Sequence, residues 1–125
     1  DALLEEFLPE VTQCVILGAG LDTRAWRLAA SARVTLYEVD FPHVLDFKAA
    51  RLAGLPLVCA ARHALAADVA APELGARLAA AGFRRERPTV WLIEGVIVDL
   101  TTAQVAAFND NLAGLSAPGS RVVAT

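Results

Sequence analysis

Short apolar runs alternate along this chain with stretches of helical periodicity, and turn residues separate them. This alternation is typical of repeated βα units, in which successive strands lie parallel. The predicted strands cover residues 11–17, 34–39, 62–67, 89–93 and 121–124, the third being the least distinct. The predicted helices begin near Leu3, Asp22, Pro42, Pro72 and Thr101. With right-handed connections, the pattern predicts an α/β fold with a doubly wound, mostly parallel sheet.

The ends and faces of several helices are also predicted. Asp22 or Thr23 is suited to accept hydrogen bonds from the first turn of the second helix. Gly82 suits the left-handed position just past the fourth helix. Thr101 and Gln104 form a capping-box pattern. Helical spacing predicts that the third helix buries Leu45, Ala49 and Leu52.

Length and composition predict a single domain over residues 1–125. The hydrophobic share is 56%, yet charged residues interrupt every apolar run well before the roughly 18 residues that span a bilayer. A sheet buried on both faces is therefore expected, and no membrane partner. Net charge is −3 and the basic residues are scattered, so no nucleic-acid partner is expected.

Cys14 and Cys59 lie in apolar stretches without metal-ligand spacing, so buried reduced thiols are expected and no metal site. The acidic, amphipathic start does not resemble a secretory signal, which predicts a cytoplasmic protein. The chain begins at Asp1 and contains no methionine, so a piece of a longer protein is expected.

The informative residues lie where the predicted strands end, because ligands of such sheets bind at the carboxyl ends of the strands. These residues are Gly18, Gly20 and Asp22 after the first strand, Asp40 after the second, Asp68 after the third and Glu94 after the fourth. Each has a structural explanation when taken singly, as a tight turn, a helix cap or a loop acid. Glu94 has the weakest one, because its apolar neighbours imply that its carboxylate needs a partner.

Together these positions suit a nucleoside-type ligand. Gly18 and Gly20 let the backbone approach it closely. Asp40 lies 20 positions after Gly20, an offset at which an acid reaches ribose hydroxyls in dinucleotide-binding folds.

Two features separate a nicotinamide cofactor from S-adenosylmethionine. Thr23 replaces the third glycine of the dinucleotide motif. Asp22 would compete with a pyrophosphate for the N–H groups at the helix start. A cationic sulfonium cofactor is favoured by the surplus of acids, so S-adenosylmethionine is the predicted cofactor.

Three segments then resemble the leucine carboxyl methyltransferase family, whose bacterial members are similar to polyketide-type O-methyltransferases. They are Val15–Ala25, containing Gly-Ala-Gly-Leu-Asp-Thr-Arg, then Tyr37–Pro42, and finally Arg87–Gly95. The resemblance runs in order over nearly the whole chain. It implies a class I methyltransferase, Rossmann-like core, here without the C-terminal antiparallel hairpin of the family.

The resemblance also implies roles for individual residues. Gly18 and Gly20 would form the cofactor turn, and Asp40 would bind the ribose. The Asp68 side chain and the Val69 backbone would contact the adenine. The family motif further includes Arg24, expected to order the acids around the pocket, and Glu94, expected to face the methionine end.

The predicted function is S-adenosylmethionine-dependent O-methyl transfer to a carboxyl or hydroxyl group of a small molecule or of a protein C-terminus. No catalytic residue is predicted, since His43 and His63 lie in no recognisable base motif. Two alternatives stay open. One is a non-catalytic remnant or interaction module, which the short chain and Asp99, at a position where many relatives have tyrosine, would suit. The other is a nicotinamide-dependent oxidoreductase.

Overall fold

The computed structural model describes residues 1–94 and 100–124. Its strands are β1 (Gln13–Leu17), β2 (Thr35–Asp40), β3 (Ala61–Ala66), β4 (Thr89–Ile93) and β5 (Arg121–Ala124). Its helices are α1 (Ala2–Phe7), α2 (Arg24–Arg27), α3 (Pro42–Arg51), α4 (Leu74–Ala80) and α5 (Thr102–Leu115). Short 3₁₀ turns, η1 (Leu8–Glu10) and η2 (Ala29–Ser31), follow α1 and α2.

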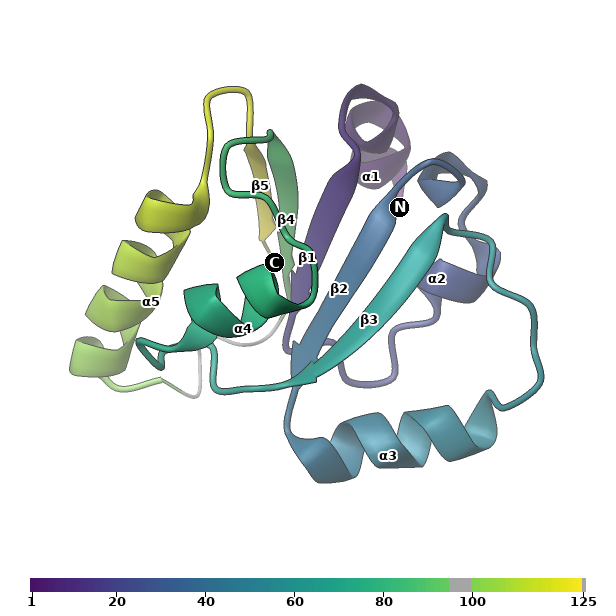
Figure 1. The fold of residues 1–125 in the computed structure, drawn as a ribbon, viewed down its shortest axis with the longest axis horizontal. Helices are drawn as coiled ribbons and strands as arrows, with labels where there is room; N and C mark the ends of the chain where they lie inside the picture. The colour runs from purple at the N-terminus through teal and green to yellow at the C-terminus, as the bar shows by residue number, and fades with distance from the viewer. Residues whose placement is uncertain (95–99, 125) are drawn as a thin grey trace.

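The strands form one sheet in the order β3-β2-β1-β4-β5, and every neighbouring pair is parallel (Figure 1). The chain moves outward from β1 to β2 and β3, then crosses to β4 and moves outward on the other side. The direction therefore reverses between β1 and β4, which is the position where open α/β sheets bind ligands. The predicted doubly wound parallel sheet is confirmed.

Helices cover the sheet on both sides, with α4 and α5 on one face and α1 and α2 on the other (Figure 1). Every residue of the central strands β1 and β4 is buried. Alternating side chains of each strand enter two separate cores. The core beneath α1 and α2 contains Ile16 and Leu36, and the core beneath α4 and α5 contains Val15 and Trp91.

The α3 helix corrects one prediction. Leu45 is buried as expected, but its partner on the buried side is Lys48, whereas Ala49 is exposed and Leu52 only partly buried. A helix pattern counts lysine as polar, so it misses a lysine whose charge is neutralised by a residue of another element. Here that residue is Glu38 of β2.

The predicted end of α4 and the predicted start of α5 are confirmed. Gly82 has φ +109° after α4, and the Gly82 and Phe83 N–H groups donate to the Ala79 and Leu78 carbonyls, the two bonds of a Schellman motif. At the start of α5, both hydrogen bonds of the Thr101–Gln104 capping box are present.

The bounds of β4 and β5 are as predicted, whereas those of β1, β2 and β3 differ from prediction by one or two residues. β1 begins at Gln13 because the chain makes the η1 turn before it. Asp40 is the last residue of β2, and Asp68 lies two residues beyond the end of β3.

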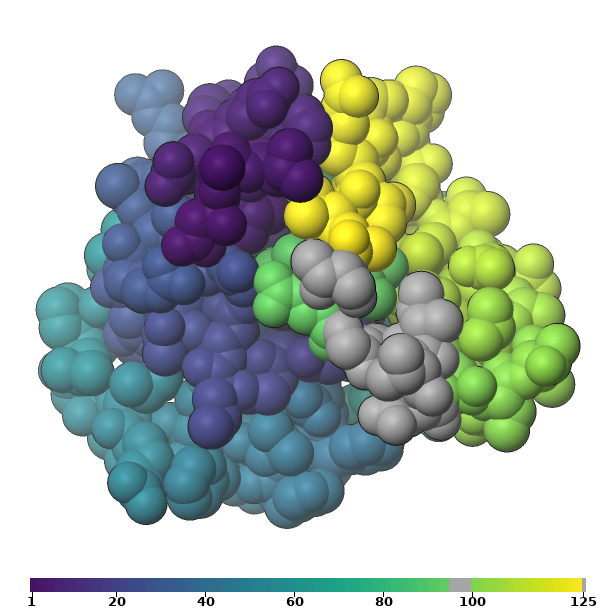
Figure 2. All heavy atoms as spheres, turned by 180° about the vertical axis from the view of Figure 1, so that it is seen from behind, coloured from purple at the N-terminus to yellow at the C-terminus, as the bar shows by residue number. Residues whose placement is uncertain are grey.

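The two ends of the chain lie close together. Figure 2 shows the N-terminal segment beside the C-terminal strand, and the Arg121 guanidinium of β5 lies 5.2 Å from the centre of the Phe7 ring. The N-terminal helix α1 therefore packs beside β5, which forms one edge of the sheet.

Candidate functional site

The turn after β1 has a backbone that glycine favours. Gly18 has φ +69° and Gly20 has φ +48°. The Gly18 and Ala19 N–H groups both donate to the Val39 carbonyl of β2, at 2.9 and 3.0 Å. These bonds fold the turn over the end of the neighbouring strand.

Asp40 is joined directly to this turn. Its Oδ2 accepts a 2.7 Å hydrogen bond from the Gly20 N–H, and its Oδ1 accepts one of 2.7 Å from the Phe41 N–H. Each carboxylate oxygen keeps a lone pair for a further donor. The structure thus brings together two of the predicted elements, the glycine turn and the acid that ends β2.

The strand register brings Glu94 to the same edge. Leu17 is the register partner of both Val39 in β2 and Ile93 in β4. The residues that follow, Gly18, Asp40 and Glu94, therefore leave three neighbouring strands at the same level.

Arg24, in the first turn of α2, connects three carboxylates. Its guanidinium donates to Asp1 at 2.8 Å, to Glu94 at 3.1 Å and to Asp22. The Asp22 side chain is only 8% exposed, and its Oδ1 also accepts the Arg24 backbone N–H at 2.8 Å. Glu94 pairs with Arg24, so its carboxylate has a partner as predicted, but its side chain is 46% exposed and not in an apolar environment. Asp22, rather than Thr23, is the residue that accepts from the first turn of α2.

A cavity of about 310 Å³ lies at this point of the sheet. Its charged lining consists of two acids, Asp22 and Glu94, and two arginines, Arg24 and Arg27. The rest of the lining comes from the glycine turn and from neighbouring residues, namely Ile16, Gly18, Ala19, Leu21 and Thr23. Because it lies between the ends of β1 and β4, this cavity occupies the switch point of the fold.

Asp68 and Val69 lie farther along the sheet edge, beyond β3. Asp68 is exposed, and its Oδ1 accepts the Ala70 N–H at 2.9 Å. The Val69 side chain packs in the core beneath α4 and α5, and its carbonyl accepts a 3.0 Å hydrogen bond from Asn111 of α5. These two residues are thus tied to their own loop and to α5, and neither lines the cavity at the switch point.

Three charged residues beneath the site were not predicted. Glu38 of β2 is fully buried and pairs with Lys48 of α3 and with Arg62 of β3. Lys48 also donates to the Asp22 carbonyl at 3.1 Å. In the sequence, Glu38 is a charged residue among mostly apolar strand residues, and this is the signal that could have indicated a buried ion pair.

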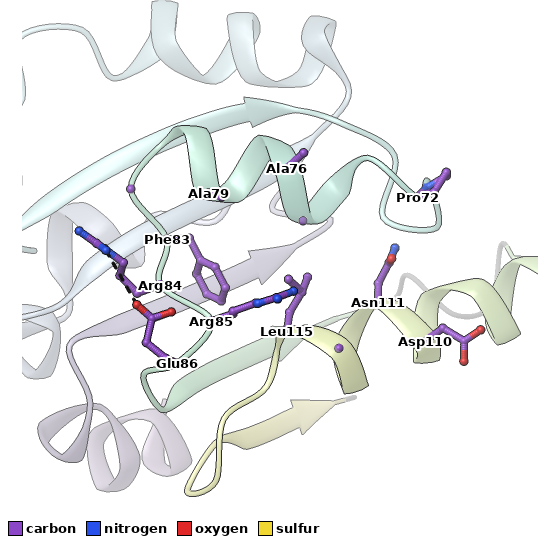
Figure 3. Close-up of a pocket in the computed structure, with 13 residues that line it drawn as sticks. Pro72, Ala76, Ala79, Phe83, Arg84, Arg85, Glu86, Asp110, Asn111 and Leu115 are labelled. Carbon is purple, nitrogen blue, oxygen red and sulfur yellow. Dashed lines mark ion pairs between the residues drawn. The ribbon is translucent and has the colours of Figure 1, made fainter.

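A larger cavity of about 700 Å³ lies elsewhere, between α4 and α5 (Figure 3). The loop from Phe83 to Glu86 closes one end of it, and Arg84 lies 3.9 Å from Glu86. It contains none of the residues predicted to bind the cofactor. The smaller cavity is the candidate site because four of the predicted cofactor residues line it, namely Gly18, Asp22, Arg24 and Glu94.

None of the thiols and imidazoles of the described residues lines the cavity at the switch point. Cys14 and Cys59 are free and buried, as predicted. Burial raises the pKa of Cys14 from 9.0 to about 12, and burial also raises the pKa of Cys59. His43 and His63 are exposed and stack on Phe41 and Tyr37, at 6.1 and 5.3 Å between ring centres.

The family model for leucine carboxyl methyltransferases matches residues 1–113. The chain belongs to this family. The family resemblance of the motifs around Gly18, Asp40 and Glu94 is thereby confirmed. Asp99, where the chain departs from many relatives, lies outside the described residues.

Curated relatives agree with this membership. A Mycolicibacterium vanbaalenii protein, named provisionally as an S-adenosyl-L-methionine-dependent methyltransferase, is 42% identical over 112 residues. A Mycobacterium bovis protein of the same provisional name is 41% identical over 123 residues. The matches cover 90% and 98% of this chain but only 37% and 39% of the two relatives.

Solved structures agree with the fold. The glycopeptide N-methyltransferase MtfA complexed with sinefungin has a TM-score of 0.68 at 18% identity, over 98% of this chain and 51% of that one. The apo S-adenosylmethionine-dependent methyltransferase SibL has a TM-score of 0.62 at 19% identity, over 98% of this chain and 35% of that one. The fold is that of class I methyltransferases.

Within residues 1–94 and 100–124, no helix has the length and apolar character needed to cross a membrane.

Proposed function

We propose that this chain is the S-adenosylmethionine-binding core of a methyltransferase. The observation that carries the proposal is the arrangement at the switch point, where the glycine turn, Asp40 and the Arg24 cluster lie at one edge of the sheet. Family membership supports it.

The charges around the cavity suit an amino-acid group. The methionine end of the cofactor carries both an ammonium and a carboxylate. Asp22 and Glu94 would attract the ammonium, and Arg24 and Arg27 the carboxylate. Acids alone would favour any cation, whereas a mixed cluster favours a zwitterion.

The space above the turn also suits a close ligand. A Cβ added at Gly20 would meet no protein atom nearer than the Gly18 carbonyl oxygen at 4.0 Å. Glycine is therefore favoured there by the positive φ and by the approach of a ligand, not by crowding from the protein.

Asp40, Asp68 and Val69 would hold the nucleoside half of the cofactor. The free lone pairs of Asp40 would accept from the ribose hydroxyls, while the Gly20 bond keeps that carboxylate in place. Asp68 and the Val69 backbone N–H would contact the adenine, with Asn111 anchoring their loop through the Val69 carbonyl.

A nicotinamide dinucleotide fits the turn poorly. A pyrophosphate binds free N–H groups at a helix start, but Asp22 already accepts the Arg24 N–H. The α2 helix spans only four residues, so its dipole offers little to an anion. The turn therefore disfavours the nicotinamide-dependent oxidoreductase alternative.

The transferred methyl is proposed to go to oxygen, on a carboxyl or hydroxyl group of a polyketide-type small molecule or of a protein C-terminus. Bound S-adenosylmethionine supplies an electrophilic methyl group on a good leaving group, so positioning contributes most of the catalysis. A carboxylate acceptor would need no general base, and we assign no catalytic residue.

We further propose that residues 1–125 form one cofactor-binding unit of a longer protein. The relatives support this, since the matched region is 37% of one and 39% of the other. The acceptor pocket would then be completed by other segments.

Titration calorimetry with S-adenosylhomocysteine tests cofactor binding by this chain. We expect saturable binding to S-adenosylhomocysteine, none to NAD, and at least about tenfold weaker binding in Asp40→Ala, which loses charge-assisted acceptors. Asp46→Ala, an exposed acid of α3, is the matched control and should bind normally. A flat response of the native chain to S-adenosylhomocysteine would contradict the proposal.

The acceptor is tested with the full-length parent protein and methyl-labelled S-adenosylmethionine. Methyl esters release labelled methanol in mild base and methyl ethers do not, so the two classes of oxygen acceptor are distinguishable. If the chain binds the cofactor but the parent labels no acceptor, the non-catalytic alternative is favoured.

A further inference from the structure

A group of buried charges lies on one side of the glycine turn, and the proposed function does not use it. The Glu38 side chain is 0% exposed and that of Lys48 1% exposed, and the two form an ion pair. Glu38 stands on the core face of β2 beside Ile16 of β1, a position where an apolar residue would ordinarily pack. Arg62 of β3 approaches the same carboxylate from the edge of the sheet.

Lys48 and Arg62 make two contacts in common. Both pair with the same oxygen, Oε1 of Glu38. Both also lie against the Trp26 ring of α2, with Lys48 Nζ 6.0 Å and Arg62 Cζ 4.6 Å from its centre.

The two cations differ in a third contact. The Lys48 ammonium donates to the backbone carbonyl of Asp22 at 3.1 Å. Arg62 has no contact with the glycine turn among the hydrogen bonds of the described residues. Lys48 of α3 therefore links Glu38 of β2 to Asp22, and the Asp22 carboxylate pairs with Arg24.

Stability alone does not account for this arrangement. Replacing a buried ion pair by apolar residues of similar size is often neutral or stabilising. In addition, Glu38 Oε2 and Arg62 Nε are buried without a hydrogen-bond partner among the residues that the structure describes. Burying these charges costs free energy, which points to a function for their position.

We propose that Lys48 is a positioning residue for the cofactor site, held by Glu38 so that its ammonium fixes the Asp22 backbone and, through it, the glycine turn and Arg24. This inference rests on the proposed function, because it names the residues that keep the proposed site in shape. Lys48 itself touches no reacting atom.

The consequence is a pre-organised turn. The Asp22 N–H donates to the Ala19 carbonyl at 2.9 Å, and the Asp22 carbonyl accepts from Lys48, so both backbone polar groups of this residue are bonded. Without Lys48, the cofactor would have to order the turn as it binds, at a cost in affinity.

The test compares Lys48→Met with Arg62→Met in the 125-residue chain. Both variants remove a cation from the same Glu38 oxygen and from the same tryptophan, and only the first removes the contact with the turn. Calorimetry should show S-adenosylhomocysteine affinity reduced at least about tenfold in Lys48→Met and less than about twofold in Arg62→Met.

Amide hydrogen exchange without ligand supplies a second measurement. The Gly20 and Asp22 amides should exchange about tenfold faster in Lys48→Met than in Arg62→Met, measured at equal distance from each variant's melting temperature. If Lys48 had a purely structural role, the exchange rates of these amides would rise in each variant in proportion to its loss of stability.

If Lys48→Met does not fold, the Glu38→Gln/Lys48→Met double variant decides, because it removes the buried acid and base together. Equal affinities and equal exchange in the variants would overturn the proposal. If instead the native chain binds no S-adenosylhomocysteine, the proposed function fails, and the exchange measurement still tests Lys48.

Discussion

Beneath α4 and α5, the strands present Val15, Val39 and Trp91 to a core of apolar side chains. Beneath α1, α2 and α3, the same sheet places Glu38 in a row with Leu36 and pairs it with Lys48. The two faces therefore differ in what holds them together. The first depends on burial of apolar surface, and the second also depends on matched charges.

The charged side is the one that reaches the candidate site. The Glu38–Lys48 pair contacts the turn at the end of β1, whereas the larger cavity on the α4–α5 side contains none of the predicted cofactor residues. Buried charge costs stability but fixes direction, since hydrogen bonds are directional and apolar contacts are not. We infer that the apolar face stabilises the domain and that the mixed face shapes the site.

The largest expected effect is on the apolar face. Trp91→Ala should lower the free energy of unfolding by about 3–5 kcal/mol, because a fully buried aromatic side chain leaves a cavity. Trp26→Ala on the other face should cost less, because Trp26 is only partly buried. Urea unfolding measures both. A larger loss of unfolding free energy in Trp26→Ala than in Trp91→Ala would contradict the inference that the apolar face is the stabilising one.

On the mixed face, Glu38→Leu should cost about 3 kcal/mol, since it leaves two cations without their acid. The Glu38→Leu/Lys48→Met double variant should regain most of that loss, with Arg62 turning toward solvent. Denaturant midpoints of the native chain, of the single variants Glu38→Leu and Lys48→Met, and of the double variant form the cycle. Additive losses would mean that the pair is not coupled.

Stability should fall in alkaline solution because of Cys14, which lies on the mixed face. Its pKa is raised from 9.0 to about 12 by burial. Above pH 9 the unfolded chain loses this proton and the folded chain keeps it, so stability is fully present below pH 9 and declines as pH rises. The expected slope from this thiol is about −1.4 kcal/mol per pH unit between the two pKa values.

Urea midpoints at pH 8.5, 9.5 and 10.5 measure this decline, and Cys14→Ala should flatten it. Burial raises the pKa values of Cys59 and Tyr37 as well, so a weaker decline above pH 9 should persist in the variant. An unchanged slope in Cys14→Ala would show that another group is responsible.

The smallest effects concern two glycines of the α4–α5 side. Gly82→Ala should destabilise the protein by about 1 kcal/mol, because Gly82 has φ +109° and a side chain there is strained. Gly114→Ala lies within α5, where a Cβ meets nothing within 4 Å, and should stabilise it by about 0.5–1 kcal/mol. Thermal unfolding should show shifts of opposite sign. Shifts of the same sign would contradict the backbone argument.

Much of the fold could be predicted because its signals are local. β4 spans Thr89–Ile93 as predicted, and the capping box at Thr101 starts α5. Part of the site was also predictable, since the ends of parallel strands share one edge and Gly20 and Asp40 must then approach each other.

The network around that edge was not predictable from spacing. Glu38 is recognisable as a charge in an apolar strand, but its partners come from a helix and from the neighbouring strand. Lys48 was not among the residues predicted to be buried on α3, and its buried ammonium pairs with Glu38 of another element. A periodicity argument sees one element at a time, whereas ion pairs join several.

The amino-acid sequence by itself therefore determined the order of strands and helices, the glycine turn and the acids at the strand ends, because these depend on local propensity and on the direction of parallel strands. Only the tertiary structure decided that Arg24 gathers Asp22 and Glu94 at one cavity, and that Lys48 holds the turn from below. Those contacts depend on side-chain direction and register across elements, which are set only when the sheet and its helices pack together.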